Sequence, residues 1–407
     1  MKNKDALMFA MLLLSVSSLG ADYYVSPRGA DSNPGTVKRP FRTIQRAANI
    51  VHPGDTVFVA DGTYNECRVA LSNSGTSSAP ITFQSQNKWG AKIVSNVGCS
   101  ENINVTGSWV VLKFLDISGG GTAGGGTSGG AHGIFLSAGT NHLVFGNRIH
   151  NMGNIASDTT NAMAGIFVQT QNDVIDSNVI FGVGRTGCIS SCSLHNDHGM
   201  YIDAALGASG TIIQNNLLYD QQVGYDIQLF PGTLNNVLII NNTMDATSPP
   251  SHGVIGCIVQ GTVLQNSRIA NNICYNPNGN VFIRSTCCGI SNPQNNVTID
   301  HNVTTARTII DVSSGTSQTN NITNASGSAL FNNVGGNDYH LVSNSPAIGA
   351  GTSNGAPAVD FDGNTRGSCK RRSPAVGTGS MLSDVPNDYK GVARANPPCI
   401  GAFEYAP

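Results

Sequence analysis

The chain has little charge. Asp, Glu, Lys and Arg make up 11% of its 407 residues, and 22 basic against 24 acidic side chains leave a formal net charge of −2. Because no basic stripe is available to displace counterions from phosphates, a nucleic-acid partner is not expected. The chain has instead 48 Gly and 44 Asn, which few helices tolerate, and 40% hydrophobic residues that can build a core. This balance indicates a β-rich extracellular solenoid rather than a disordered chain.

The sequence also has only one long apolar run. It extends from Ala6 to Leu19, follows the basic Lys2 and Lys4, and ends at a small-residue site before Ala21. A transmembrane anchor needs about 20 apolar residues, which is longer than this run. We therefore expect residues 1–20 to be a cleavable signal peptide. The mature chain should be secreted, either extracellular or periplasmic, with no transmembrane segment.

Cysteine or histidine doublets with the spacing of zinc ligands are missing, which disfavours a zinc site. Ten cysteines follow the expected cleavage site, an even number that favours disulfides in an oxidising compartment. Cys188 and Cys192 can close a small loop, and Cys369 can pair with Cys399 in the C-terminal segment. The adjacent residues 287 and 288 should reach two different partners. The spacing leaves the connectivity open.

A short unit recurs along the middle of the chain, in which apolar residues lead into Asn. The six copies are Leu143-Val144-Phe145-Gly146-Asn147, Val174-Ile175-Asp176-Ser177-Asn178, Ile212-Ile213-Gln214-Asn215-Asn216, Leu238-Ile239-Ile240-Asn241-Asn242, Arg268-Ile269-Ala270-Asn271-Asn272 and Thr298-Ile299-Asp300-His301-Asn302. The final Asn recurs at intervals of 31, 38, 26, 30 and 30 residues, which is a solenoid period with loop insertions.

A second short strand precedes most copies of this unit. Its copies are Gly133-Ile134-Phe135-Leu136, Gly165-Ile166-Phe167-Val168, Gly199-Met200-Tyr201-Ile202, Asp226-Ile227-Gln228-Leu229 and Cys257-Ile258-Val259. Short alternating strands separated by turn residues stack in parallel coils rather than pair as hairpins. Repeated Asn at a bend fits a ladder, because Asn tolerates left-handed backbone angles and its amide can bond to the next coil. The prediction is an all-β fold, a right-handed parallel β-helix.

The two ends differ from the repeats, as solenoid caps do. We expect an N-terminal cap over residues 21–66, β-helix repeats over 67–335 and a separate C-terminal segment over 336–407. In the cap, Thr43 to Ile50 predicts a short amphipathic helix that has Thr43 as its N-cap and plugs the open coil.

Both ends also resemble known proteins. The run that includes Tyr23-Tyr24-Val25-Ser26-Pro27, Pro53-Gly54-Asp55-Thr56-Val57 and Gly62-Thr63-Tyr64 resembles the cap of secreted right-handed β-helix proteins of the pectate-lyase-like superfamily. The stretch with Asp338-Tyr339-His340-Leu341 and Asp360-Phe361-Asp362-Gly363-Asn364 resembles a choice-of-anchor Q domain. The resemblance implies the fold, secretion and association with a polysaccharide.

The resemblance does not imply the reaction, because the superfamily contains lyases, hydrolases, epimerases and non-enzymatic binders. Lyases of the superfamily often use a Lys or Arg base beside calcium held by Asp, and the candidate strip contains no Lys. Mannuronan epimerases of the superfamily carry an Asp-Pro-His-Asp motif. The stretch Leu194-His195-Asn196-Asp197 lacks its first Asp and its Pro. No catalytic residue is therefore carried over from a family motif.

Period-two alternation predicts which residues of the second strand face solvent. Ile134, Leu136 and their equivalents should point inward, and the predicted outward residues are Phe135, Ser137, Phe167, Gln169, Tyr201, Asp203, Asp226, Gln228 and Phe230. Coils lie about 4.8 Å apart, so Phe135, Phe167 and Tyr201 would form an aromatic ladder that can hold a sugar chain. The alternative is that loops cover these rings.

Polar residues flank this ladder. His132 and His198 hold the same position about 10 Å apart, two coils away from each other, and Tyr225 holds it in the next coil. The residues expected to contact substrate are His132, Phe135, Phe167, Gln169, Arg185, Tyr225 and Gln228.

The densest polar cluster runs from Leu194 to Asp203 and predicts the catalytic residues. If the substrate is a uronate polymer, elimination needs a base and a positive group or Ca²⁺ that neutralises the carboxylate. His195 or His198 can serve as base and Tyr201 as acid. Arg185, or a Ca²⁺ ion held by Asp197 and Asp203, can serve as neutraliser.

A hydrolase would instead need two carboxylates about 5 to 10 Å apart. Asp203 and Asp226, one coil apart on the predicted strip, would provide them. The sequence thus predicts a secreted monomeric β-helix that binds an acidic or plant-type polysaccharide and cleaves it by β-elimination. A glycoside hydrolase and a non-catalytic glycan-binding or cell-surface protein are the alternatives.

Overall fold

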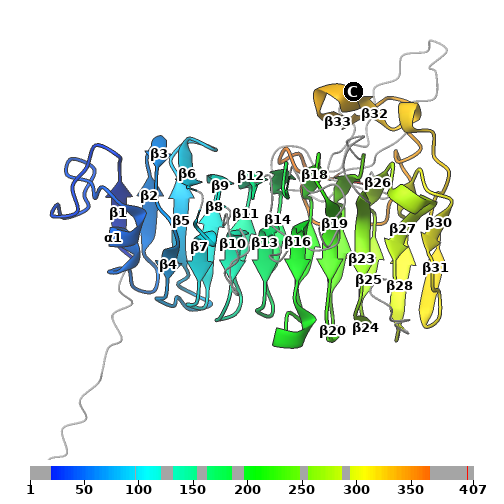
Figure 1. Cartoon of the computed structure of the whole chain (residues 1–407), viewed down its shortest axis with the longest axis horizontal. Coiled ribbons are helices and arrows are strands. Elements are labelled where there is room, and N and C mark those ends of the chain that lie inside the picture. Colours follow the sequence, from blue (N-terminus) through cyan, green and yellow to red (C-terminus); the bar gives the residue numbers. More distant parts are fainter. Residues whose placement is uncertain are drawn as a thin grey trace, which may run out of the picture.

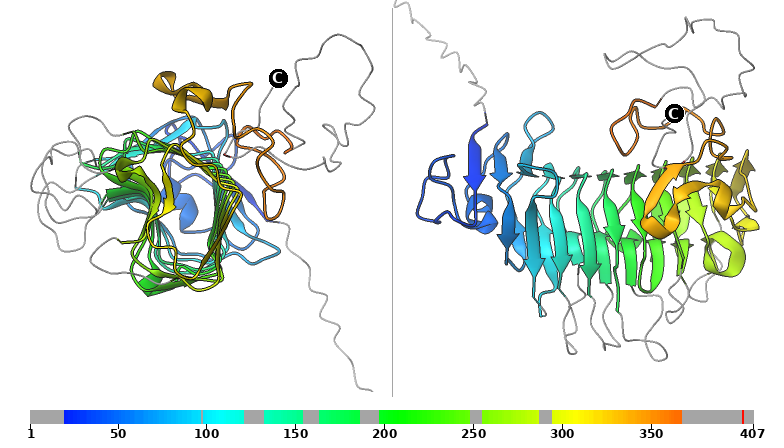
Figure 2. Two further views of the ribbon diagram at one scale, coloured as in Figure 1. Left: turned by 90° about the vertical axis from the view of Figure 1, so that its right-hand side faces the viewer. Right: turned by 90° about the horizontal axis from the view of Figure 1, so that it is seen from above.

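The computed structural model describes residues 20–96, 98–120, 132–153, 163–185, 197–247, 255–286, 294–366 and 401. The chain winds into parallel coils that stack along one axis, from β1 (Asp22–Val25) at one end to β31 (Thr316–Thr319) at the other (Figure 1). Seen along this axis, three sheets surround the core (Figure 2, left). The predicted all-β parallel helix is therefore confirmed.

Each full coil gives one strand to each sheet in turn. Within the described residues, the first sheet contains β1, β2 (Thr56–Val59), β5 (Ile81–Ser85), β8 (Val110–Lys113), β11 (Leu143–Phe145), β14 (Val174–Asp176), β17 (Ile212–Gln214), β21 (Leu238–Ile240), β25 (Arg268–Ala270), β28 (Val297–Asp300) and β31. In the same part of the chain, the second sheet contains β3 (Gly62–Tyr64), β6 (Ala91–Ser95), β9 (Asp116–Gly119), β12 (Arg148–Met152), β15 (Val179–Phe181), β18 (Leu217–Tyr219), β22 (Thr243–Asp245), β26 (Ile273–Tyr275) and β29 (Val303–Thr304).

The third sheet carries the predicted second strands. Its described strands are β4 (Val69–Leu71), β7 (Glu101–Val105), β10 (His132–Leu136), β13 (Met163–Val168), β16 (Asp197–Ile202), β19 (Gly224–Leu229), β23 (Ile255–Gln260), β27 (Val281–Arg284) and β30 (Thr308–Ile310). Two small sheets consist of β20 (Thr233–Asn235) with β24 (Val263–Gln265) and of β32 (Phe331–Asn333) with β33 (Asp338–Leu341). Short 3-10 turns are η1 (Ala204–Leu206), η2 (Asn278–Asn280), η4 (Gly327–Ala329) and η5 (Val334–Gly336).

The predicted capping helix is confirmed as α1 (Ile44–Ala48). The Thr43 hydroxyl accepts a hydrogen bond from the Arg46 backbone N–H, which satisfies one free donor of the first turn. The Glu66 carboxylate accepts two more, from the N–H groups of Ile44 and Gln45. Ile44, like Ala47 and Ala48, is buried in the core, so the helix closes one end of the coil stack.

The core lies inside the coils, where the three sheets turn their apolar residues toward one another. The predicted inward residues of the third sheet are all 0% exposed: Ile134, Leu136, Ile166, Val168, Met200, Ile202, Ile227 and Leu229. Strand alternation therefore gave the inner face of this sheet correctly at these positions.

The predicted asparagine ladder is also confirmed, between the first and second sheets. In each step the backbone N–H and the side-chain amide of one Asn donate to the Oδ1 of the next, at 2.9 to 3.0 Å. The ladder residues are Asn147, Asn178, Asn216, Asn242, Asn272, Asn302 and Asn321. The left-handed backbone belongs to the residue before each of them, such as Asn215 with φ 55°. In each coil, one residue thus turns the backbone and the Asn that follows it makes the hydrogen bonds to the next coil.

The described C-terminal residues fold back along the outside of the second sheet (Figures 1 and 2). Tyr339 and Leu341 of β33 form a buried cluster with outward apolar residues of this sheet, including Leu217 and Ile273. The Tyr339 hydroxyl donates to the buried Asp245 carboxylate at 2.7 Å. The second sheet is therefore partly covered.

Two disulfides, Cys67–Cys99 and Cys257–Cys274, account for the four described cysteines, which confirms the disulfide prediction for these residues. The remaining candidate pairings, at residues 188, 192, 287, 288, 369 and 399, lie outside the described residues, as does the expected signal peptide up to residue 19. Among the described helices, none has both the length and the apolar character needed to cross a bilayer.

Candidate functional site

The outward residues of the third sheet line up from coil to coil. Strand pairing places the following in one column, which we call the outer strip: Asn104, Phe135, Phe167, Tyr201, Gln228, Val259 and Arg284. A parallel column beside it contains Glu101, His132, Ala164, His198, Tyr225 and Gly256.

The aromatic ladder predicted for the outer strip is present. Phe135 and Phe167 stack with ring centroids 4.8 Å apart and planes 5° apart, and Tyr201 meets Phe167 edge-on at 4.9 Å. All three side chains are half-buried, so each presents part of its ring to solvent. Burial and the neighbouring Asp203 carboxylate raise the pKa of Tyr201, which keeps the phenol protonated at neutral pH.

Imidazole rings support the ladder from the parallel column. The His132 ring lies 4.8 Å from the Phe167 ring, and burial lowers the pKa of His132 to about 4, so this ring is neutral at pH 7. His198 contacts Tyr201 and Tyr225, with ring centroids 5.8 and 6.3 Å away. The Nδ1 of His198 accepts a hydrogen bond from the Tyr225 backbone N–H at 3.3 Å, which puts the proton of a neutral ring on Nε2.

The prediction that His198 and Tyr225 present themselves to a substrate is weakened by their burial. They are 0% and 2% exposed, respectively. His195, the other predicted base, lies outside the described residues.

Arg185 is not the free positive group that the sequence suggested. It is 1% exposed and binds Asp197 through both side-chain oxygens, with Nε to Oδ2 at 2.8 Å and Nη2 to Oδ1 at 2.9 Å. Burial raises the pKa of Asp197, and the guanidinium opposes this rise. Because Arg185 and Asp197 flank residues 186–196 in the sequence, the ion pair joins the two ends of that insertion. The substrate-binding role of Arg185 stays a prediction, which the ion pair and the burial of the side chain weaken.

A shared Ca²⁺ ion on Asp197 and Asp203 is also wrong. The two residues lie at opposite ends of the extended strand β16, about 20 Å apart along it. Asp203 instead caps η1 by accepting from the Ala205 N–H, and it accepts from the Gln169 amide at 3.1 Å. Across the described ranges, no three His, Cys, Asp or Glu side chains are placed to share a metal ion.

Asp226 does not face solvent, which corrects the sequence prediction. It follows the glycines at positions 133, 165 and 199 in one column, and a Cβ added to these would lie 2.7 to 2.8 Å from core atoms of Ile149, Ile180 and Leu218. This column points inward, and Asp226 is 0% exposed. Asp226 therefore cannot form a hydrolytic pair with Asp203. Strict alternation fails here because two successive residues of the strand both point inward.

Burial raises the pKa of Asp226 well above its usual range, and the charge of Asp245 adds to the rise. Gln228 is outward as predicted but only 4% exposed, and its Oε1 accepts no hydrogen bond from the described residues. The half-buried outer-strip residues that can meet a ligand are thus Phe135, Phe167, Tyr201 and Arg284.

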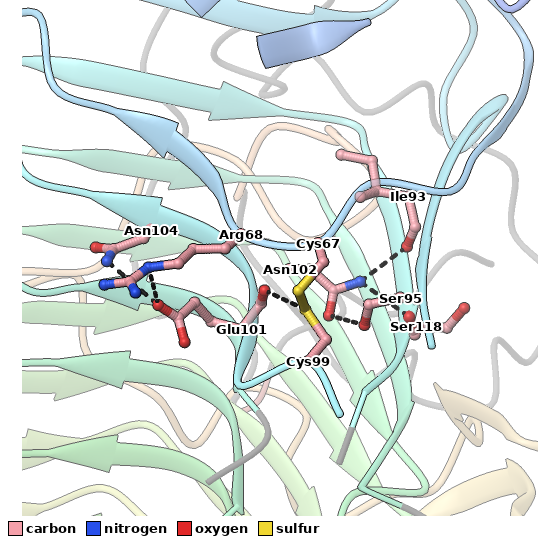
Figure 3. The surroundings of a disulfide bond; sticks show 9 residues. All are labelled: Cys67, Arg68, Ile93, Ser95, Cys99, Glu101, Asn102, Asn104 and Ser118. Atoms are coloured by element: carbon pink, nitrogen blue, oxygen red, sulfur yellow. Dashed lines mark hydrogen bonds and ion pairs between the residues drawn. A yellow bond between two sulfur atoms is a disulfide. The ribbon is translucent and has the colours of Figure 1, made fainter. Parts of the chain in front are cut away.

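At the N-terminal end of the outer strip lies a polar cluster (Figure 3). Arg68 pairs with the buried Glu101 carboxylate at 2.8 Å, and Asn104 donates to the same Oε1 at 3.3 Å. The disulfide between Cys67 and Cys99 lies next to this pair in the chain and in space. It holds Arg68 close to Glu101, so the charge of Arg68 is compensated.

Arg284 at the other end was missed by the sequence analysis. It follows Val281-Phe282-Ile283 in a strand one coil beyond Cys257-Ile258-Val259, the last copy that was recognised. Extending the alternation by one coil would have put Arg284 on the outer strip.

Comparisons with known proteins agree with this architecture. Residues 23–215 match the family model described as Pel9A-like, right handed beta helix region. The uncharacterized protein YwoF of Bacillus subtilis (strain 168) is 47% identical over 64 residues, which are 16% of this chain and 14% of that protein. Pectate lyase PEL9 of Emericella nidulans is 38% identical over 85 residues, which are 21% of this chain and 20% of that protein. The matches thus span no more than a fifth of these relatives.

The crystal structure of pectate lyase Pel9A is similar over almost the whole chain. It has a TM-score of 0.56 and 15% identity, with 96% of this chain and 97% of that chain covered. At this identity the likeness is one of fold. The fold is a right-handed parallel β-helix, which the family model matches over residues 23–215 and the Pel9A structure shares.

Proposed function

We propose that this protein binds an acidic polysaccharide along the outer strip and cleaves it by β-elimination. The observation that carries the proposal is the half-buried ladder of Phe135, Phe167 and Tyr201, whose spacing of 4.8 to 4.9 Å follows the coil repeat. Half-buried aromatic rings in register offer a row of apolar surface against which sugar rings can pack. The names of the relatives, which include pectate lyases, support a uronate polymer as the substrate class.

In the elimination, a base removes the proton from the carbon next to the uronate carboxylate. The electron pair forms a carbon–carbon double bond, and the bond to the leaving sugar oxygen breaks. This oxygen takes up a proton, which Tyr201 can donate because its phenol is protonated at neutral pH. His195 as the base stays a prediction. His198 acts through Tyr201, against which its ring packs, and is a positioning residue.

The test is an assay of the purified mature chain with pectate, alginate, glucuronan and neutral glycans, with and without Ca²⁺. Absorbance of unsaturated uronates and release of reducing ends are read together. A rise in both signals for an acidic glycan supports elimination. Reducing ends without absorbance would replace the lyase with a hydrolase.

Tyr201→Phe gives the sharpest variant, since it keeps the ring and removes the proton donor. We expect a fall in kcat of about 10²-fold or more with little change in binding. Tyr219→Phe is the matched control, because Tyr219 is also a half-buried member of an aromatic stack, 5.0 Å from Phe181 on the second sheet. An equal loss in both variants would remove the acid role from Tyr201.

A non-catalytic glycan-binding protein is the second candidate. The observation that favours it is the burial of Asp197, His198 and Asp226, which are no more than 1% exposed. Such a protein would bind an acidic glycan through the ladder and release neither unsaturated products nor reducing ends.

We also propose that the protein acts outside the cytoplasm. The disulfides Cys67–Cys99 and Cys257–Cys274 support an oxidising compartment. The signal peptide over residues 1–20 and the choice-of-anchor Q identity of residues 336–407 remain predictions from the sequence. Mass spectrometry of the secreted chain, with Ala21 as the expected N-terminus, tests the first of these.

A further inference from the structure

The elimination proposed above needs a positive group that binds the uronate carboxylate, and none has yet been assigned on the third sheet. The substrate carboxylate must be held and its charge offset while the neighbouring proton is removed. Arg185 is committed to Asp197, and Asp197 and Asp203 lie too far apart to hold one cation. Arg68 is committed to Glu101.

Among the described residues, Arg284 is the arginine that the outer strip itself contains. Its strand β27 pairs with β23 so that Arg284 lies beside Val259, three coils from Tyr201, or about 14 Å along the sheet. The side chain is half-buried rather than fully extended into solvent. No hydrogen bond or ion pair joins its guanidinium to another described residue within ordinary distance.

The surroundings of this guanidinium include the Gly279 backbone and the Asp311 carboxylate. Its Nη2 lies against Gly279, where an added Cβ would come within 2.3 Å. Asp311 is the nearby carboxylate, but its oxygens accept from the Ser285 backbone N–H and hydroxyl and from the Thr286 hydroxyl, each at 2.6 Å. Burial raises the pKa of Asp311, but hydrogen bonds from Ser285 and Thr286 and the charge of Arg284 lower it below its ordinary value. Burial raises the pKa of Tyr225, and the charge of Arg284 opposes this rise.

Tyr225 connects this charge to the ladder. Its ring covers Gly256, where an added Cβ would lie 2.5 Å from the ring, and its other neighbour is His198. Along the outer strip itself, Gln228 and Val259 lie between Tyr201 and Arg284, and Tyr225 lies beside them in the parallel column.

We propose that Arg284 binds a carboxylate of the glycan, as an anchor for an acidic sugar unit beyond the aromatic ladder. This assignment rests on the proposed function and names the charge that selects a uronate polymer over a neutral one. A planar guanidinium with free N–H groups binds a carboxylate through two parallel hydrogen bonds.

The test measures binding by calorimetry to oligouronates prepared from pectate, alginate and glucuronan, and to their methyl esters. The variants are Arg284→Gln, Arg284→Lys and the matched control Arg39→Gln, which removes an equal charge from an exposed arginine near the other end of the solenoid. Thermal melting of each variant checks the fold.

For the oligouronate that binds wild type, Arg284→Gln should lose affinity by roughly tenfold or more. Arg284→Lys should retain part of the affinity, and Arg39→Gln should retain all of it. Binding of the methyl ester should be weaker in wild type and unchanged by Arg284→Gln.

Unchanged affinity of Arg284→Gln for the acidic ligand would overturn the anchor, while wild-type binding would leave the proposed function standing. An equal loss of affinity for the acid and the methyl ester would also overturn the anchor. Arg284 would then contribute to the shape of the binding surface and would not bind the carboxylate. Failure of wild type to bind any oligouronate would overturn both proposals together.

Discussion

Asp226 is a carboxylic acid that points into the core, at a position where the alternation of inward and outward residues along the strand breaks. Its carboxyl lies in the inward column with three glycines and is 0% exposed, and its Oδ1 and Oδ2 accept no hydrogen bond of ordinary geometry from the described residues. The buried form is therefore the neutral acid, since charging it inside the core is costly.

We expect Asp226→Asn to stabilise the protein at neutral pH. The folded pKa of Asp226 is raised above its unfolded value, so its cost to stability is absent below a pH of about 4 and grows as the pH rises toward the folded pKa. Each unit in that window costs up to about 1.4 kcal/mol. Urea unfolding at pH 4 and pH 7 should show a difference between variant and wild type that increases with pH. An equal difference at both pH values would mean that Asp226 is not the titrating group.

Phe167 tests the ladder at its centre. It contacts Phe135, Tyr201 and His132, so Phe167→Ala removes the middle of the stack. We expect affinity for the acidic glycan to fall about 3- to 10-fold. The matched control is Phe181→Ala, which removes a half-buried ring stacked between His150 and Tyr219 on the second sheet. Equal losses in the two variants would place glycan binding elsewhere.

At the scale of elements, the asparagine ladder ties each coil to the next. Asn242 is 0% exposed; its Oδ1 accepts from the backbone and side chain of Asn216, and its amide donates to Ile213 and Asn272. Replacing it leaves buried donors and acceptors of two other coils without partners.

Asn242→Ala should therefore lower the free energy of unfolding by about 2 to 4 kcal/mol. The change is measured by urea denaturation. Asn344→Ala, at an exposed position away from the ladder, should stay within about 0.5 kcal/mol of wild type. A cost for Asn242→Ala as small as that of the control would show that the ladder does not hold the coils together.

The elements also mark where sequence reasoning succeeds and fails. The Asn period fixed the stacking, because each copy pairs in register with the next, as Leu238 does with Arg268. Strict alternation could not place Asp226, because the inward glycines lack the side chains that would have marked the break. Nor could it foresee that Arg185 closes an ion pair with Asp197 or that Asp203 caps η1, since both contacts depend on how loops return to the sheet.

At the scale of the molecule, the described C-terminal residues cover part of the outer face of the second sheet, while on the third sheet the rings of the outer strip stay half-buried. The described C-terminal residues cover apolar side chains of the second sheet, including Val179, Leu217, Ile273 and Val303. We expect a chain that ends at residue 335 to expose these side chains and to associate at concentrations where the full chain stays dispersed. Size-exclusion chromatography of the two chains tests this. Identical elution would mean that the C-terminal segment does not shield the sheet.

The central claim is that the third sheet holds an acidic glycan along its outer strip. The most direct measurement is a crystal structure of the protein with an oligouronate that it binds. The account predicts sugar rings against Phe135, Phe167 and Tyr201, with one carboxylate at Arg284. An oligouronate bound to another face, with the outer strip bare, would contradict it.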